Sequence, residues 1–107
     1  MGYAFIDTVG ILGNILSTGR EIQVECAECK GLHRFTAAEI AGLAEKVGRE
    51  FNLLNRRCRC RLTPGCTGWN RFFFRSGVYR PLFTPEQSGR WSDEARAARM
   101  SLPPTTL

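Results

Sequence analysis

The chain has 107 residues, of which 43% are hydrophobic and 10% aromatic, and its formal net charge is +5 at pH 7. This length favours a single domain, and the composition is ordinary for a globular protein. The apolar stretch at residues 3–16 is interrupted by Asp7, Gly10 and Gly13 and is too short to span a membrane. Residues 1–19 contain no Lys or Arg, so the basic start of a signal peptide is missing. We therefore expect a cytoplasmic protein with no membrane partner.

Residues 1–21 form an N-terminal apolar segment whose structure the sequence leaves open. Apolar side chains recur at helical spacing at Phe5, Val9, Leu12 and Leu16. The two glycines of this stretch would each cost a helix about 1 kcal/mol. A packing helix, a strand and an interface all remain compatible with the segment.

Two cysteine clusters delimit the next segment, residues 22–83. The first is Cys26-x-x-Cys29, and the second contains Cys58, Cys60 and Cys66. Four thiolates in a tetrahedral arrangement suit zinc better than other common ions. Disulfides and inert buried cysteines are the alternatives, but five cysteines would leave one unpaired and no export signal is visible. We therefore expect one structural Zn²⁺ per chain.

The choice of ligands is clear for the first cluster and open for the second. Cys26 and Cys29 are the expected ligands of the first cluster, with Gly31 taking the positive φ that ends the turn. In the second cluster we favour Cys60 with Cys66, because Pro64-Gly65 can then turn the chain between them. Cys58 is the alternative to Cys60, since both would lie on one face of a strand. His33 is a weaker candidate ligand.

The segment between the cysteine clusters predicts a short hairpin followed by a helix. Strands are expected at residues 22–26 and 32–35, on either side of the first cluster. Thr36-Ala-Ala-Glu39 is a capping box that begins a helix, and Gly48 ends it. The apolar face of this helix is expected to consist of Ile40, Leu43, Ala44 and Val47. A second short helix at residues 51–57 would make the pair resemble a helix-turn-helix superficially.

The C-terminal part of the chain predicts a two-faced strand and then short helices. In a strand at residues 69–75, Asn70, Phe72 and Phe74 would point one way, and Trp69, Arg71, Phe73 and Arg75 the other. The sequence does not decide which face is buried. Residues 78–80 are expected to pair back onto this strand. Residues 84–107 are expected to contain short helices, starting at Thr84 and Ser92, and a mobile tail.

Positive charge is concentrated in residues 51–85, which contain seven arginines and no acidic residue. Some of these arginines would compensate the formal charge of −2 on a four-thiolate zinc site. We expect the rest to form a binding face with nearby aromatic rings, consisting of Arg56, Arg57, Arg71, Arg75, Trp69 and Phe73. Guanidinium groups alternating with rings are suited to nucleic acid. An acidic protein surface, contacted by a small regulator or inhibitor, is the alternative partner.

The paired cysteine clusters around a basic, helical insert resemble those of bacterial zinc-ribbon or zinc-knuckle small proteins. The resemblance covers residues 22–75, and Cys26-x-x-Cys29 carries it best. It implies an α+β domain with a zinc-ribbon-like sheet, and a binding function rather than catalysis. A full set of cysteine ligands is also typical of structural zinc, so we do not expect an enzyme.

Overall fold

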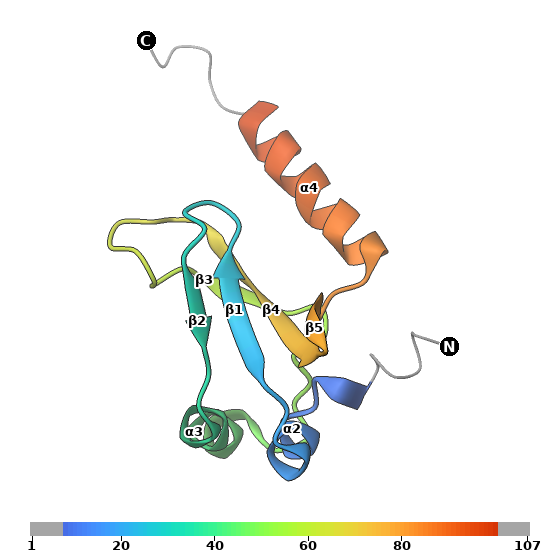
Figure 1. The fold of residues 1–107 in the computed structure, drawn as a ribbon. Helices are drawn as coiled ribbons and strands as arrows, with labels where there is room; N and C mark the ends of the chain where they lie inside the picture. The colour runs from blue at the N-terminus through green and yellow to red at the C-terminus, as the bar shows by residue number, and fades with distance from the viewer. Residues whose placement is uncertain (1–7, 101–107) are drawn as a thin grey trace.

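The structure is a computed structural model that describes residues 8–100, with side chains over residues 8–98. It combines three helices and a five-stranded antiparallel sheet within this range (Figure 1), which confirms the predicted α+β class. The helices are α2 (Leu12–Thr18), α3 (Ala37–Val47) and α4 (Pro85–Met100). The strands are β1 (Ile22–Cys26), β2 (Leu32–Arg34), β3 (Arg57–Arg59), β4 (Trp69–Ser76) and β5 (Val78–Pro81). Phe5 and the tail at residues 101–107 lie outside the described residues.

Strand β4 is the centre of the sheet. Its first edge pairs with β1 from Ile22 opposite Phe74 to Cys26 opposite Asn70. Its second edge pairs with β3 near its start and with β5 near its end. Strand β2 completes the sheet beside β1, as the predicted hairpin required. Both predicted strands around the first cysteine cluster are therefore confirmed, as is the return of β5 onto β4.

The two faces of β4 have different roles. Asn70, Phe72 and Phe74 are buried, whereas the intervening residues are half-buried or exposed. The register places Arg57 opposite Arg71, so these two side chains project from the second face. We call the side of Phe72 and Phe74 the core face, and the side of Arg71 the outer face. The period-2 alternation that the sequence predicted is confirmed.

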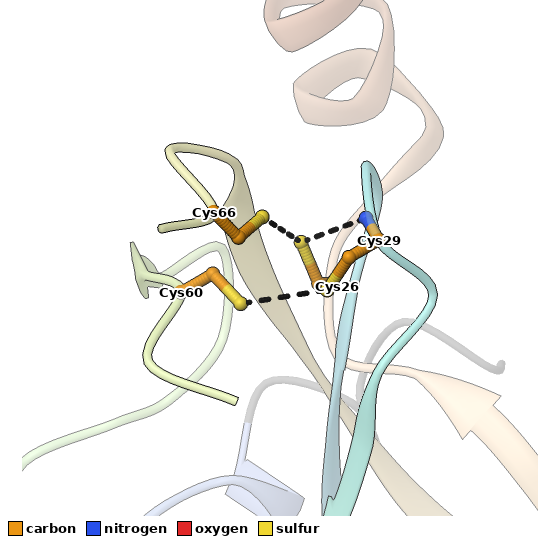
Figure 2. A group of neighbouring side chains, drawn as sticks. All are labelled: Cys26, Cys29, Cys60 and Cys66. Carbon is orange, nitrogen blue, oxygen red and sulfur yellow. Dashed lines mark hydrogen bonds between the residues drawn. The ribbon is translucent and has the colours of Figure 1, made fainter. Parts of the chain in front are cut away.

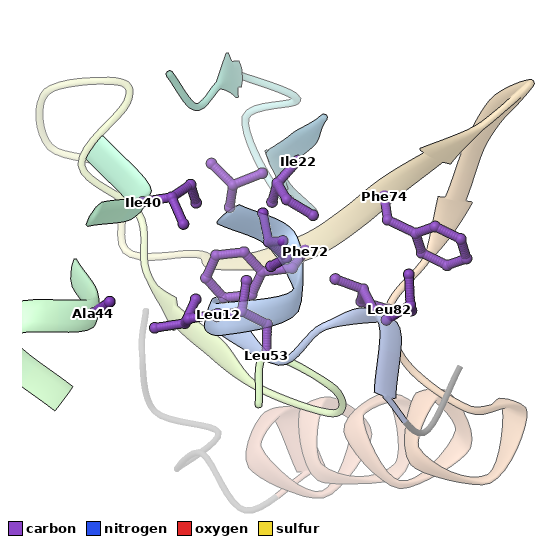
Figure 3. Close-up of a cluster of buried hydrophobic side chains, with 11 residues drawn as sticks. Leu12, Ile22, Ile40, Ala44, Leu53, Phe72, Phe74 and Leu82 are labelled. Carbon is purple, nitrogen blue, oxygen red and sulfur yellow. The ribbon is translucent and has the colours of Figure 1, made fainter. Parts of the chain in front are cut away.

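The hydrophobic core lies on the core face, at the end of the sheet covered by α2 and α3 (Figures 1 and 3). Phe72 and Phe74 of β4 are packed there with Ile22 of β1 and Leu82. Leu12 of α2 is fully buried in the same cluster. The described part of the N-terminal segment therefore contributes Val9, Leu12 and Ile15 to the core, and burial of such side chains contributes about 1.5–3 kcal/mol each.

Helix α3 begins where the sequence predicts. The Glu39 amide donates to the Thr36 hydroxyl at 3.1 Å, and the Thr36 amide donates to the Glu39 carboxylate at 2.8 Å. Ile40 and Ala44 are buried, which confirms the apolar face at these positions. Val47 is 42% exposed, so the prediction that it completes this face is wrong. It lies in the last turn, next to Gly48, where the helix ends.

The second helix expected at residues 51–57 is absent, and the superficial helix-turn-helix with it. Several of its backbone groups bond to other parts of the chain instead of forming a helical ladder. The Leu12 amide donates to the Phe51 carbonyl at 2.9 Å, and the Leu53 amide donates to the Gly10 carbonyl at 2.9 Å. Tertiary hydrogen bonds have replaced the local helical ones, because they also bury Leu53 in the core.

The C-terminal prediction is also corrected, because a single helix of 16 residues replaces the short helices. Thr84 caps it as predicted, with the Gln87 amide donating to the Thr84 hydroxyl at 3.2 Å. Ser92 lies inside this helix rather than at the start of another. In Figure 1, α4 begins after β5 and runs toward and past the end of the sheet opposite α2 and α3, and its Trp91 and Glu94 contact Arg57 of β3.

Candidate metal centre and arginine-rich face

Four cysteine sulfurs come together at the end of the sheet farthest from α2 and α3 (Figures 1 and 2). Cys26 is the last residue of β1, and Cys29 lies in the turn that follows. Cys60 follows β3, and Cys66 precedes β4. All four sulfurs lie within 4.8 Å of one another, so this group could hold one metal ion. Cys26 and Cys60 are buried, and Cys29 and Cys66 are partly exposed.

The sulfur spacing matches a tetrahedral thiolate site. The Cys26 and Cys66 sulfurs are 3.7 Å apart, and so are those of Cys29 and Cys60. A zinc–sulfur bond of about 2.3 Å in tetrahedral geometry places neighbouring sulfurs about 3.8 Å apart. A disulfide would require about 2 Å. The distances therefore fit ligands around one ion better than a pair of disulfides.

Backbone amides are directed at each of the four sulfurs. In every case the donor is the amide two residues after the cysteine, at 3.3–3.4 Å. The pairs are Glu28 with Cys26, Gly31 with Cys29, Leu62 with Cys60, and Gly68 with Cys66. Such donors stabilise negative charge on sulfur and fix its direction. The backbone around all four cysteines thus favours thiolates.

The thiols differ in acidity. Hydrogen bonds from the Thr63 hydroxyl and the Gly31 amide lower the pKa of Cys29 to about 6. The Gly68 amide also acts to lower the pKa of Cys66, but burial and the three neighbouring thiols outweigh it and raise that pKa to about 11. Removing a proton from Cys66 beside another thiolate is unfavourable without a cation. A bound divalent ion would supply the missing positive charge.

Two features of the second cysteine loop have clear steric reasons. The Cys66 amide donates to the Thr63 carbonyl at 3.0 Å, with Gly65 at φ +83°, so Pro64-Gly65 forms the expected turn. A Cβ on Gly68 would lie 2.5 Å from Cγ of Glu28 and 2.9 Å from the sulfur of Cys26. Glycine at position 68 therefore lets the two cysteine loops approach each other.

The sequence analysis missed the roles of Thr63 and Gly68. A signal for Gly68 exists in the repeated Cys-x-Gly, which occurs at Cys29-Lys30-Gly31 and at Cys66-Thr67-Gly68. The prediction that Gly31 takes a positive φ is wrong, because Lys30 does so at φ +64°. A Cβ on Gly31 would lie 3.1 Å from Cβ of Leu62, so this glycine serves close approach.

The structure places both alternative ligands outside the cluster. Cys58 lies on β3 opposite Asn70 and is exposed. Cys60 lies just after the end of β3, where its amide still donates to the Gly68 carbonyl at 3.0 Å, and its side chain is buried whereas that of Cys58 is exposed. His33 lies on β2, where its Nε2 is 3.0 Å from the Glu39 carboxylate.

The outer face carries a stack of arginines and tryptophans, which we call the Arg–Trp stack: Arg57, Arg59, Trp69 and Trp91. The Arg59 guanidinium lies 3.9 Å from the centre of the Trp69 ring. Arg57 lies 4.3 Å from Trp69 and 5.1 Å from Trp91 of α4, and it forms an ion pair with Glu94. The chain's own arginines therefore occupy the ring of Trp69, which was expected to be open for stacking.

The other predicted face residues are also engaged. Phe73 packs edge-on against Phe83, with centroids 5.6 Å apart. Arg75 pairs with Glu21 at 3.2 Å, and hydrogen bonds from Tyr79 and Arg75 lower the pKa of Glu21. Arg56 lies against Phe51, 4.6 Å from its ring centre, and is not part of the Arg–Trp stack.

Arg71 differs from these arginines in its partners. It lies 5.2 Å from the ring of Phe83, and it forms no ion pair with any described residue. Its Nε is buried and has no hydrogen-bond partner among the residues at 8–98. A guanidinium that is half-buried without a carboxylate is energetically unfavourable unless another anion is bound.

A cleft of about 350 Å³ separates α4 from the start of β4, and we call it the α4 cleft. Its walls include Arg57, Trp69 and Arg71 from the sheet and Ser88, Trp91 and Ser92 from α4. The segments that follow Cys26 and Cys66 also line it, through Glu28 and Thr67. The loops of the four-cysteine cluster thus form part of the wall of this cleft.

No helix within residues 8–100 is long and apolar enough to cross a membrane. Comparisons with protein-family models, with curated proteins and with solved structures found no match to this chain. The likeness to zinc-ribbon proteins therefore remains a resemblance, carried by the cysteines. What stands on the structure itself is a four-cysteine cluster that could bind one metal ion, within a small α+β domain.

Proposed function

We propose that this chain is a zinc-binding module whose metal is structural and whose outer face binds nucleic acid. The zinc assignment is supported by the four convergent sulfurs, their spacing and the amides directed at them. Four thiolates fill the coordination sphere of zinc and leave no open position for a substrate. We accordingly propose a binding protein rather than an enzyme, in a reducing compartment such as the cytoplasm.

The observation that carries the nucleic-acid proposal is the grouping of arginines on the outer face, next to the metal centre. Arg57, Arg59 and Arg71 project from the same side of β3 and β4. Of these, Arg59 and Arg71 have no carboxylate partner among the described residues. Guanidinium groups that are stacked on rings keep their N–H edges available for phosphate oxygens. This supports contacts to the phosphate backbone rather than stacking of bases on Trp69.

A salt-dependent titration tests this proposal. Fluorescently labelled single-stranded and double-stranded oligonucleotides should bind the zinc-loaded protein at low salt, and log affinity should fall linearly with log salt. Arg59→Gln should reduce the slope by about one unit. Arg49→Gln is the matched control, because Arg49 is also exposed but lies beside α2, at the other end of the sheet. Equal slopes for wild type and Arg59→Gln, or no binding at low salt, would argue against the proposal.

An acidic protein surface is the second candidate partner. It is favoured by the ion pairs that the same face already makes, Arg57 with Glu94 and Arg75 with Glu21. Competition separates the two candidates: nucleic acid should displace a bound acidic protein if both use this face. If generic DNA and RNA neither bind at low salt nor compete, the protein partner is preferred.

A further inference from the structure

The α4 cleft is lined by hydrogen-bond donors and has little negative charge. Arg57 and Arg71 contribute guanidinium groups, which donate hydrogen bonds and accept none. Ser88, Ser92 and Thr67 add hydroxyl groups. Glu28 is the one carboxylate among the residues that line the cleft, and it is exposed. This set of groups is complementary to an anion.

Arg71 is the residue of the cleft whose charge most favours binding of an anion. Arg57 in the same cleft is already paired with Glu94, so its charge is compensated. The charge of Arg71 has no such partner within residues 8–98, and its Nε is buried and unbonded. The buried Nε is out of reach of a ligand, so an anion in the cleft would gain from the uncompensated charge of Arg71 rather than from a bond to Nε.

The size of the cleft indicates which kind of ligand could bring an anionic group into it. A volume of about 350 Å³ is at the lower end of the range for small-ligand sites. It can admit one nucleotide unit, whereas a duplex is far too wide to enter between α4 and β4. A single strand can turn one nucleotide away from its neighbours and into such a site.

We propose that the α4 cleft binds one nucleotide of a single-stranded nucleic acid, with its phosphate on Arg71. This inference rests on the proposed function and narrows it from nucleic acid in general to single strands. Ser88 and Ser92 lie four residues apart on α4, so both hydroxyls face the same ligand from one side of the helix. Arg59, beside the cleft on the outer face, binds the adjoining phosphate.

The two tryptophans of the chain provide a local readout. The sequence contains two, Trp69 and Trp91, and both line the cleft. A ligand that enters the cleft should therefore change the intrinsic fluorescence of the protein. Anisotropy of a labelled oligonucleotide reports binding anywhere on the surface. The two measurements together separate occupancy of the cleft from binding elsewhere.

The experiment titrates the zinc-loaded full chain with an octamer of thymidine and with an eight-base-pair duplex. The single strand is expected to bind and to change the tryptophan emission, and the duplex is expected to leave the emission unchanged. AMP and inorganic phosphate are titrated separately, because each has a phosphate group in common with the octamer but is not part of a strand. Saturating AMP is expected to change the emission only weakly and to be displaced by the octamer.

Ser92→Glu and Ala97→Glu are a matched pair of variants. Both positions are exposed on α4, so both variants should fold, and both add the same charge. Ser92 lines the cleft, whereas Ala97 lies on another side of the helix. Ser92→Glu should weaken octamer binding at least about tenfold through repulsion inside the cleft, against about twofold or less for Ala97→Glu. Arg71→Gln should weaken it similarly, provided that its melting temperature shows it to be folded.

The possible failures are distinguishable. If the octamer binds without any change in tryptophan emission, or if both glutamate variants weaken binding equally, the cleft is not the site, although the proposed function stands. If no oligonucleotide binds at low salt, the proposed function fails and the inference fails with it. A response to AMP that the octamer cannot displace would mean that the cleft takes a free nucleotide, which also overturns the inference.

Discussion

The hydroxyl of Thr63 lies 3.1 Å from the sulfur of Cys29 and donates a hydrogen bond to it. Loss of a hydrogen-bond partner of a metal ligand typically lowers the affinity for the metal by about 10–100-fold. We expect Thr63→Val to weaken zinc binding by about tenfold, measured by competition with a chromogenic chelator. Thr67→Val is the control, because Thr67 is exposed in the same loop and accepts the Arg59 hydrogen bond through its backbone carbonyl. Equal affinities for the two variants would mean that the hydroxyl contributes nothing.

The four-cysteine cluster predicts that replacing Cys58 of β3 and replacing Cys60 of the loop after it have different effects on zinc binding. Cys58→Ser should keep about one zinc per chain, because Cys58 lies outside the cluster. Cys60→Ser should lose most of its affinity, since it removes a buried ligand. Metal analysis of protein purified without added metal measures both. Retention of zinc by Cys60→Ser together with its loss from Cys58→Ser would reverse the assignment.

Glycine at position 68 should be essential for the metal centre. An added methyl group would meet Glu28 and the Cys26 sulfur at under 3 Å, so Gly68→Ala should lower both zinc affinity and melting temperature. Gly42→Ala is the opposite case, because Gly42 is exposed in α3 with no atom near its missing Cβ. It should raise the free energy of unfolding by about 0.5–1 kcal/mol. Thermal and denaturant unfolding with saturating zinc test both.

The ion pair between Arg57 and Glu94 predicts an effect on nucleic-acid binding. Glu94 neutralises an arginine of the outer face, so Glu94→Gln should strengthen oligonucleotide binding several-fold at low salt. Asp93→Asn removes the same charge from the neighbouring position, where Asp93 pairs with Arg96 of its own helix. Its effect should be clearly smaller. If the two variants behave alike, general charge rather than Arg57 explains the change.

The capping box of α3 predicts a defined pH dependence. The Thr36 amide and His33 lower the pKa of Glu39, so its carboxylate stabilises the fold at pH values above the ordinary value of 4.5. This contribution should be lost only as the pH falls through the lower value in the folded state. The stability difference between wild type and Glu39→Gln, measured by denaturant unfolding, should therefore shrink as the pH falls below the ordinary value of 4.5. Thr36→Ala should cost about 1 kcal/mol at pH 7.

Local patterns in the sequence were sufficient for much of the fold. The alternation along β4, the cap at Thr36 and the Pro64-Gly65 turn each depend on residues close together in the chain. The missing helix at residues 51–57 shows the limit of such patterns. Its apolar residues have helical spacing, but its backbone bonds to Gly10 and Leu12, which no local pattern can reveal.

The candidate site was predictable to a similar extent. The cysteine spacing indicated a metal centre, because Cys-x-x-Cys directs two sulfurs to one point. The formation of the Arg–Trp stack on the outer face was not predictable, since the ring of Trp91 comes from α4, 22 residues after Trp69. The sequence therefore showed which groups were available, but not that Arg57 and Arg59 would occupy the Trp69 ring.

Strands β1 and β4 are held together at two places of different chemistry. The pair Ile22–Phe74 lies in the hydrophobic core, whereas Cys26–Asn70, four residues along β1, lies at the cysteines. Removal of the ion should therefore loosen the sheet from one end. Amide hydrogen exchange after chelation should accelerate first around Ala27, whose amide donates to the Trp69 carbonyl, and last around Phe35, whose amide donates to the Ile22 carbonyl. The sheet would thus open progressively from the end with the cysteines, and the amides that exchange most slowly would lie beneath α2 and α3.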